Sequence, residues 1–282
     1  MKMEVKTMKI GCCTGTLPRW KTDVGYEYAE LIQKAGYDFI DLPIAQVSLM
    51  SDGEFKEMKS YLNSLGLSVP TCNSYATKDI KLVGPEVQTQ KIRDFYRKVL
   101  ERAGELGTKA ICFGAPWTKH CPEGFSKKDA FAQLVDWCSE MGEEAAKYDV
   151  ILALEPISRK ETNMLNNFEE VVELAKAVNH PNIKCLQDYY QMRMDDDTVD
   201  SMLKYGGEFM AHNHFATYPN RGFPVNQDDD PYIRTYFRAL HQIGYDGTIC
   251  QEGLPASRES FYEEAVRARN FIRDWWDETA AE

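Results

Sequence analysis

The sequence predicts a parallel α/β barrel built from eight strand–helix units. Eight short apolar runs recur through the 282 residues, amphipathic charge-bearing segments alternate with them, and glycine ends several of those segments just before the next apolar run. Apolar runs of this kind are typical of parallel strands that are covered on both faces. Eight such units in about 250 residues match a (β/α)₈ barrel, whose functional sites follow the carboxyl ends of the strands.

The strand candidates are spaced along the whole chain. Each is a run of five to seven residues, largely Ile, Val, Leu, Phe, Ala and Cys. The expected strands are residues 9–13, 38–43, 68–73, 110–115, 150–156, 183–188, 209–215 and 248–253.

The helix candidates lie between these runs and carry charge on one side. Glycine is expected to end five of them in the left-handed conformation, at positions 36, 66, 107, 207 and 244. The expected helices are residues 26–36, 54–66, 89–107, 128–148, 166–178, 197–207, 232–244 and 260–278.

A doubly wound sheet is the alternative arrangement of alternating strands and helices. It is expected to carry a G-x-G-x-x-G phosphate-binding motif after its first strand, and the segment GCCTGTLPRW (11–20) lacks that motif. No linker or low-complexity stretch divides the chain, so we expect one barrel domain over residues 1–282. Long loops are expected at 74–86, 116–128 and 216–231; such loops are either substrate contacts and lids or mobile surface.

Composition and charge limit the classes of partner that the chain is expected to bind. The apolar fraction of 43% supplies a buried core, and the net charge of −11 disfavours a nucleic-acid groove, which needs clustered Lys and Arg. No run approaches the roughly 18 apolar residues of a membrane helix, and the start of the chain has no signal-peptide stretch. The eight cysteines form no C-x-x-C pair, and six lie in strand candidates. We therefore expect a reduced, cytoplasmic protein without cysteine-bound zinc, nucleic acid or membrane partners.

Potential metal ligands end four successive strand candidates in the second half of the chain. They are Glu155, Asp188, His214 and Glu252. Residues two apart on a strand share a face, and the residues two positions before the three carboxylates are apolar. If those apolar side chains fill the barrel, the carboxylates also point inward, at its mouth.

The seventh strand offers two histidines on one face. His214 lies nearer the end of the strand and is the expected ligand, whereas His212 is expected one layer deeper and is a candidate substrate-binding residue.

Each of these residues alone has an ordinary structural explanation. A single strand-end acid is more often a helix cap or salt-bridge partner, and a single strand histidine is more often a hydrogen-bonded core residue. Together, three inward carboxylates would repel one another without a cation. Three oxygens and one imidazole suit Mn²⁺, Mg²⁺ or Co²⁺, with Zn²⁺ or iron as alternatives. Such a site can chelate the carbonyl and neighbouring hydroxyl of a ketose.

The segments LEPISRKE, LQDYY, HNHF and CQEG, in this order on the last four strands, resemble the xylose-isomerase-like TIM barrels. The resemblance is nearest to the sugar epimerases and isomerases of the tagatose/psicose 3-epimerase and inosose isomerase kinds, and it covers nearly the whole chain. It implies a divalent metal, Mn²⁺ first, on Glu155, Asp188, His214 and Glu252. It also implies that Glu155 and Glu252 form the acid/base pair of an isomerase or epimerase that works through an enediolate of a keto-sugar or polyol-ketone.

The resemblance implies substrate contacts as well, with two departures. Glu161 matches a substrate-binding glutamate of the family. Gln191 stands where the epimerases carry a substrate-binding histidine, and Arg221 lies one residue further along than the family's arginine, in a segment without H-x-G-E. These departures weaken the expectation of a free-ketose epimerase and open other reactions of the superfamily.

Two side chains after the fourth strand complete the candidate site. Trp117 and His120 could line a sugar pocket, Trp117 by stacking on a ring face; a packed loop aromatic and a surface histidine are the alternative. The aromatic C-terminal helix is expected to pack on the barrel, and any aromatic surface left exposed could serve a homodimer or homotetramer.

Three other functions fit the same sequence. One is a dehydratase or lyase that acts on a keto-sugar or keto-glycoside by β-elimination. The second is a metal-dependent abasic-site endonuclease, which would need more metal ligands and a basic groove. The third is a non-catalytic sugar-binding barrel.

Overall fold

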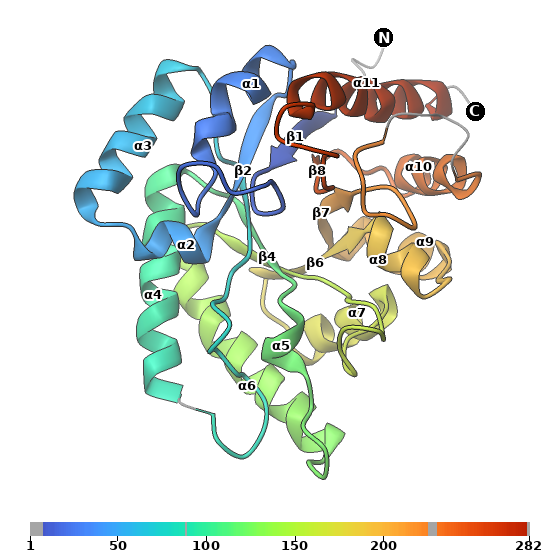
Figure 1. Ribbon diagram of the computed structural model, residues 1–282. Helices are drawn as coiled ribbons and strands as arrows, with labels where there is room; N and C mark the ends of the chain where they lie inside the picture. Colours follow the sequence, from blue (N-terminus) through green and yellow to red (C-terminus); the bar gives the residue numbers. More distant parts are fainter. Residues whose placement is uncertain (1–7, 88, 225–229, 281–282) are drawn as a thin grey trace, which may run out of the picture.

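A closed barrel of eight parallel strands forms the centre of the molecule, in a computed structural model that describes residues 8–87, 89–224 and 230–280 (Figure 1). The strands pair in sequence order, and β1 pairs with β8 to close the barrel. This confirms the predicted (β/α)₈ fold and excludes the doubly wound sheet. The strands are β1 (Lys9–Cys13), β2 (Phe39–Pro43), β3 (Thr71–Asn73), β4 (Ala110–Phe113), β5 (Ile151–Leu154), β6 (Ile183–Asp188), β7 (Met210–Phe215) and β8 (Thr248–Gln251).

Helices surround the strands, and each main helix falls where its pattern predicts it (Figure 1). Three short helices, α2, α5 and α8, were not predicted, because four to six residues are too few to show a helical repeat. Helices α2 and α8 follow their strands directly, and α5 begins shortly after β4. The helices are η1 (Tyr26–Tyr28), α1 (Ala29–Lys34), α2 (Ile44–Leu49), α3 (Asp52–Ser64), α4 (Thr89–Leu106), α5 (Pro116–Lys119), α6 (Lys127–Ala146), α7 (Phe168–Val178), α8 (Tyr189–Met194), α9 (Asp200–Phe209), α10 (Tyr232–Gln242) and α11 (Phe261–Thr279).

Several predicted boundaries differ from the observed ones, and two of the differences have a clear physical reason. Gly207 does not end its helix: α9 continues to Phe209, and the neighbouring Gly206 is small because a Cβ there would lie 2.7 Å from Ile243 Cδ1. The glycine pair therefore serves close helix packing and not a cap. Strand β3 begins at Thr71 and not at residue 68, because Pro70 has no N–H to donate to a strand ladder.

Two small hydrophobic clusters lie inside the barrel, apart from the main core. Gly11 leaves the space that the Phe39 ring occupies, because a Cβ at Gly11 would overlap that ring. The two clusters are Cys13, Phe39 and Cys250, and Cys112, Ala153 and Leu186.

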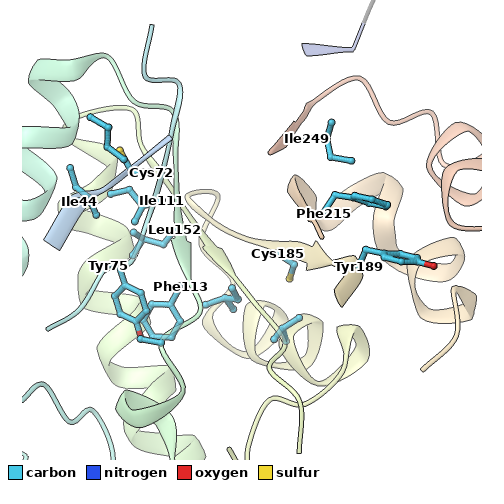
Figure 2. Close-up of a cluster of buried hydrophobic side chains, with 14 of the residues drawn as sticks. Ile44, Cys72, Tyr75, Ile111, Phe113, Leu152, Cys185, Tyr189, Phe215 and Ile249 are labelled. Atoms are coloured by element: carbon cyan, nitrogen blue, oxygen red, sulfur yellow. The ribbon is translucent and has the colours of Figure 1, made fainter. Parts of the chain in front are cut away.

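The outer faces of the strands pack against the helices through aromatic rings. Tyr75 stacks on Phe113 with ring centroids 4.2 Å apart, and Tyr189 stacks on Phe215 at 4.9 Å (Figure 2). Because strand side chains alternate, an outward Phe215 directs His214 into the barrel.

The described residues also allow the expectations for the cysteines, the C-terminal helix, a membrane span and the long loop 216–231 to be compared with the structure. All eight cysteines are buried and unpaired. Trp275 and Trp276 of α11 are buried against the barrel and do not add exposed aromatic surface. Within residues 8–87, 89–224 and 230–280, no helix is long and apolar enough to cross a membrane. Part of the predicted loop 216–231, residues 225–229, lies outside the described residues.

Candidate active site

The structure gathers four ligand-type side chains at the carboxyl ends of four adjacent strands. Glu155 follows β5, Asp188 ends β6, His214 lies one residue before the end of β7, and Glu252 follows β8. One ligand atom from each lies within 4.8 Å of all the others. Their exposures are 5%, 1%, 0% and 4% in the same order. We call Glu155, Asp188, His214 and Glu252 the four-ligand cluster.

Room for the cluster depends on a glycine after β4. A Cβ on Gly114 would overlap Glu155 Oε2. The Glu155 carboxylate is further held by the Cys112 thiol, which donates to Oε2 at 3.0 Å, and its main chain by Lys119, whose Nζ donates to the Glu155 carbonyl at 2.5 Å. Burial lowers the pKa of this Lys119 to about 8.

We expect Gly114→Ala to lower kcat/KM about 10²-fold if Glu155 is the proton-transfer group that the sequence predicts, because a displacement of about 1 Å in such a group costs that much. Steady-state kinetics and a thermal melt would measure the change. Gly53→Ala is the matched control, since the nearest atom to a Cβ there is 4.0 Å away. Equal losses of activity in both variants, or none in either, would contradict the role assigned to Gly114.

Several buried atoms of the cluster have no hydrogen-bond partner. Asp188 accepts from the Tyr190 N–H through Oδ1 at 2.8 Å, which leaves its buried Oδ2 unpaired. His214 Nδ1 lies 3.5 Å from Glu155 Oε1 and 3.3 Å from Glu252 Oε2 without a hydrogen bond of good geometry. Burial, followed by the charges of Glu252 and Glu155, raises the pKa of Asp188 to about 7. Buried polar atoms left unpaired are costly, and a divalent cation among these donors would satisfy them.

Arg221 supplies positive charge at one side of the cluster. Its Nη2 donates to Glu252 Oε2 at 2.9 Å and lies 4.0 Å from Asp188 Oδ2. The Leu254 N–H donates to the Arg221 carbonyl at 2.7 Å, which ties the loop after β7 to the loop after β8. Burial alone would raise the pKa of Glu252, but the charges of His214 and Arg221 outweigh it and hold that pKa well below its usual range.

A second layer lies deeper in the barrel. His212, 1% exposed, bonds through Nδ1 to Thr248, and its Nε2 has no partner. Ligand-type atoms of Asp41, His212 and His214 lie within 4.8 Å of one another. Asp41 accepts from the Thr71 hydroxyl at 2.6 Å through Oδ2, while its Oδ1 is unpaired. His212 is as buried as the residues of the four-ligand cluster, and its role as a substrate contact stays a prediction.

Asp41 lies close to His214 in this layer, and neither His214 Nε2 nor Asp41 Oδ1 has a hydrogen-bond partner. A carboxylate that accepts from a metal-bound histidine fixes its tautomer and raises its basicity, and we expect Asp41 to act in this way if His214 binds a metal. We expect Asp41→Asn to weaken Mn²⁺ binding about 10- to 100-fold in calorimetry. The exposed Asp129→Asn is the control. Unchanged affinity in a folded Asp41→Asn protein would contradict this role.

The remaining candidates border the cluster. Gln191 accepts from the Ser158 N–H at 2.9 Å and donates to Glu161 Oε1 at 3.1 Å, so both ends of its amide are engaged within the protein. Glu161, Trp117 and His120 line one cavity of about 750 Å³.

Sequence reasoning missed Gly114 and Lys119, and it also missed three side chains on strands β2, β3 and β4. Asn73, at the end of β3, donates through Nδ2 to Glu252 Oε1, and Asp41 and Cys112 lie on β2 and β4. The alternation argument that located the four ligands, extended to the strands of the first half, would have pointed these side chains inward as well.

The family model described as xylose isomerase-like TIM barrel matches residues 29–275. The chain belongs to this family. This confirms the predicted resemblance and places the chain in a family that includes sugar epimerases and isomerases.

Individual relatives agree with the family assignment. The chain is 25% identical over 236 residues to D-psicose 3-epimerase of Ruminiclostridium cellulolyticum, covering 83% of this chain and 79% of that protein. The crystal structure of D-psicose 3-epimerase with D-tagatose from Clostridium cellulolyticum H10 superposes with a TM-score of 0.83 at 23% identity, covering 95% and 99% of the two chains. The IOLI protein with a bound zinc atom superposes with a TM-score of 0.76 at 18% identity, covering 96% and 99%.

Proposed function

We propose that this protein is a divalent-metal-dependent keto-sugar epimerase or isomerase. The carrying observation is the four-ligand cluster: three buried carboxylates and one imidazole within 4.8 Å, with Asp188 Oδ2 and His214 Nδ1 unpaired. Glu155, Asp188, His214 and Glu252 would hold the cation. Their three oxygens and one nitrogen suit Mn²⁺, which we propose first, with Mg²⁺, Co²⁺ and Zn²⁺ as alternatives.

A cation bound there would polarise a substrate carbonyl and acidify the adjacent C–H. Glu155 and Glu252 are then the proton-transfer groups. They follow β5 and β8, which are separated by β6 and β7, and therefore reach the centre of the mouth from different directions. One carboxylate removes the proton to give an enediolate, and the other returns it. Return to the opposite face of the same carbon gives an epimer. Return to the neighbouring carbon, with the hydroxyl proton moving to the former carbonyl oxygen, gives an isomer.

Other side chains are placed to bind the substrate. We propose that Arg221 binds a substrate oxygen, since its guanidinium already lies beside Glu252 and Asp188. Glu161, positioned by Gln191, faces the cavity beside the cluster, as do Trp117 and His120.

The test is solvent exchange on a panel of ketoses. The Mn²⁺-loaded protein is incubated with each ketose in D₂O, and products are followed by NMR and mass spectrometry. We expect one deuterium at the carbon next to the carbonyl, together with an epimer or an isomer. A product lighter by water or by an aglycone would instead establish elimination. Binding without turnover or exchange across the panel would establish a sugar-binding barrel.

A further inference from the structure

Lys119 is a buried cationic side chain that is not paired with a carboxylate. It is fully enclosed, at 0% exposure, and its Nζ donates to the main-chain carbonyl of Glu155 at 2.5 Å. Within residues 8–87, 89–224 and 230–280, Lys119 forms no salt bridge. A lysine is rarely buried completely unless it is paired, because its ammonium group loses its hydration. The burial of Lys119 therefore needs an explanation from its surroundings.

The short helix α5 carries Lys119, and the loop after β3 holds this helix in place. Trp117 Nε1 donates to the Thr77 carbonyl at 2.9 Å, and the Leu82 N–H donates to the Thr118 carbonyl at 2.8 Å. From α5 the lysine side chain reaches the residue that follows β5. The charge of Lys119 is therefore fixed at both ends of its side chain, by a tethered helix and by the hydrogen bond of its ammonium group.

The four-ligand cluster accounts for a positive charge at this point. Lys119 binds the main chain of Glu155, whose carboxylate belongs to the cluster. Burial lowers the pKa of Lys119 to about 8, and the charge of Glu155 is the largest of the effects that oppose this shift. Arg221 lies beside the carboxylates of Glu252 and Asp188. Each of the three carboxylates thus has a cationic side chain near it.

A fixed positive charge beside a cation site has two opposite effects. It repels a divalent cation held by the carboxylates, and it attracts an anion that forms at the same place. Both interactions are strong in a buried site, where water screens them little. In the proposed reaction an anion forms when a carboxylate removes the proton next to the substrate carbonyl. Fixed charge placed where negative charge develops lowers the barrier without any reorganisation of the protein.

We propose that Lys119 is a positioning residue of this active site, which holds the main chain of Glu155 and stabilises the anion formed by proton removal, at the expense of metal affinity. The inference rests on the proposed function, and it adds to it a residue that acts through Glu155 and through its own charge.

The test compares two neutral variants. Lys119→Gln loses the charge but keeps an N–H donor for the Glu155 carbonyl, whereas Lys119→Met loses both. Calorimetry measures the Kd of Mn²⁺, steady-state kinetics on the substrate identified by the exchange panel measure kcat and KM, and a thermal melt reports folding. Lys127→Met is the matched control, because Lys127 Nζ also donates to a main-chain carbonyl, that of Asn163 at 2.8 Å, but is exposed.

We expect both Lys119 variants to bind Mn²⁺ about tenfold more tightly than wild type, because a buried like charge is removed. We expect their kcat to fall about 10²-fold with little change in KM, the usual result when fixed charge that stabilises an anion is lost. Lys127→Met should match wild type in Kd, kcat and KM.

The direction of the change in affinity separates the charge of Lys119 from a purely structural role. If Lys119 only supported the Glu155 main chain, Lys119→Met would bind Mn²⁺ more weakly and Lys119→Gln would resemble wild type. Equal or weaker Mn²⁺ binding by a folded Lys119→Gln protein would overturn the inference, and so would tighter binding with an unchanged kcat.

The two proposals fail separately. Tighter Mn²⁺ binding by both Lys119 variants, without exchange on any ketose by wild type, would support the charge of Lys119 beside the cation site and refute the epimerase or isomerase activity. Exchange by wild type, with the Kd of Mn²⁺ and kcat unchanged in Lys119→Gln, would retain the activity and refute the role of Lys119.

Discussion

Glu155→Gln and Glu252→Gln are each expected to lower kcat/KM about 10²- to 10⁴-fold, the usual loss when a positioned acid or base is removed. Glutamine keeps the size of the side chain, and in each case it removes the carboxylate that accepts or returns the proton. Steady-state kinetics on the substrate identified by the exchange panel would measure the loss. Metal content, determined on the same samples, separates loss of the base from loss of the cation.

If the reaction is an epimerisation, the same two variants also test the opposite-face arrangement. Each variant retains one of the two proton-transfer groups, so each should still exchange the hydrogen of one epimer with solvent, and the two variants should prefer opposite epimers. Glu208→Gln, on the exposed end of α9, is the matched control. Conversion at the normal rate in either variant, or exchange of the same epimer by both, would show that the two carboxylates do not share the task in this way.

The fold was predictable because parallel strands buried on both faces leave a strong apolar signal, repeated eight times. The four-ligand cluster was predictable for a related reason: alternation fixes which side chains point inward, and the closed barrel brings all strand ends to one mouth. The contacts around the cluster were not predictable from the sequence. Alternation points Cys112 and Asn73 into the barrel, but it does not predict that the Cys112 thiol contacts Glu155 or that the Asn73 amide contacts Glu252, because those contacts depend on rotamers and on the register of the closed barrel.

The glycines also show what the sequence alone does not predict. Gly36 and Gly244 have positive φ, as the C-cap prediction requires, whereas Gly207 lies inside α9 next to a glycine that is needed for contact with Ile243. Gly114 is required for a third reason, the space that the Glu155 carboxylate occupies. Sequence identifies the residue but not which of these constraints acts on it, because two of the three are contacts with residues far along the chain.

Removal of the metal is expected to destabilise the protein as well as to abolish turnover. At a free Mn²⁺ concentration 100 times its Kd, binding stabilises the folded state by about 2.7 kcal/mol, which corresponds to a Tm increase of about 5–10 °C for a domain near this size. The physical reason is local. Without a cation the buried carboxylates of Glu155, Asp188 and Glu252 repel one another, and Arg221, His214 and Lys119 offset part of their charge. Thermal melts with Mn²⁺ and after chelation would measure the difference.

Asp188→Asn separates the metal effect from a general effect of ionic strength. The variant loses one anionic ligand, so its Tm should respond little to Mn²⁺. Its metal-free form should be at least as stable as metal-free wild type, because a neutral amide in this 1% exposed position removes one of three mutually repelling charges. A wild-type Tm that is the same with and without Mn²⁺, Mg²⁺, Co²⁺ and Zn²⁺ would mean that these carboxylates are balanced by the cationic side chains of the protein itself, Arg221, His214 and Lys119. The four-ligand cluster would then be a charge network in the barrel mouth and not a cation site.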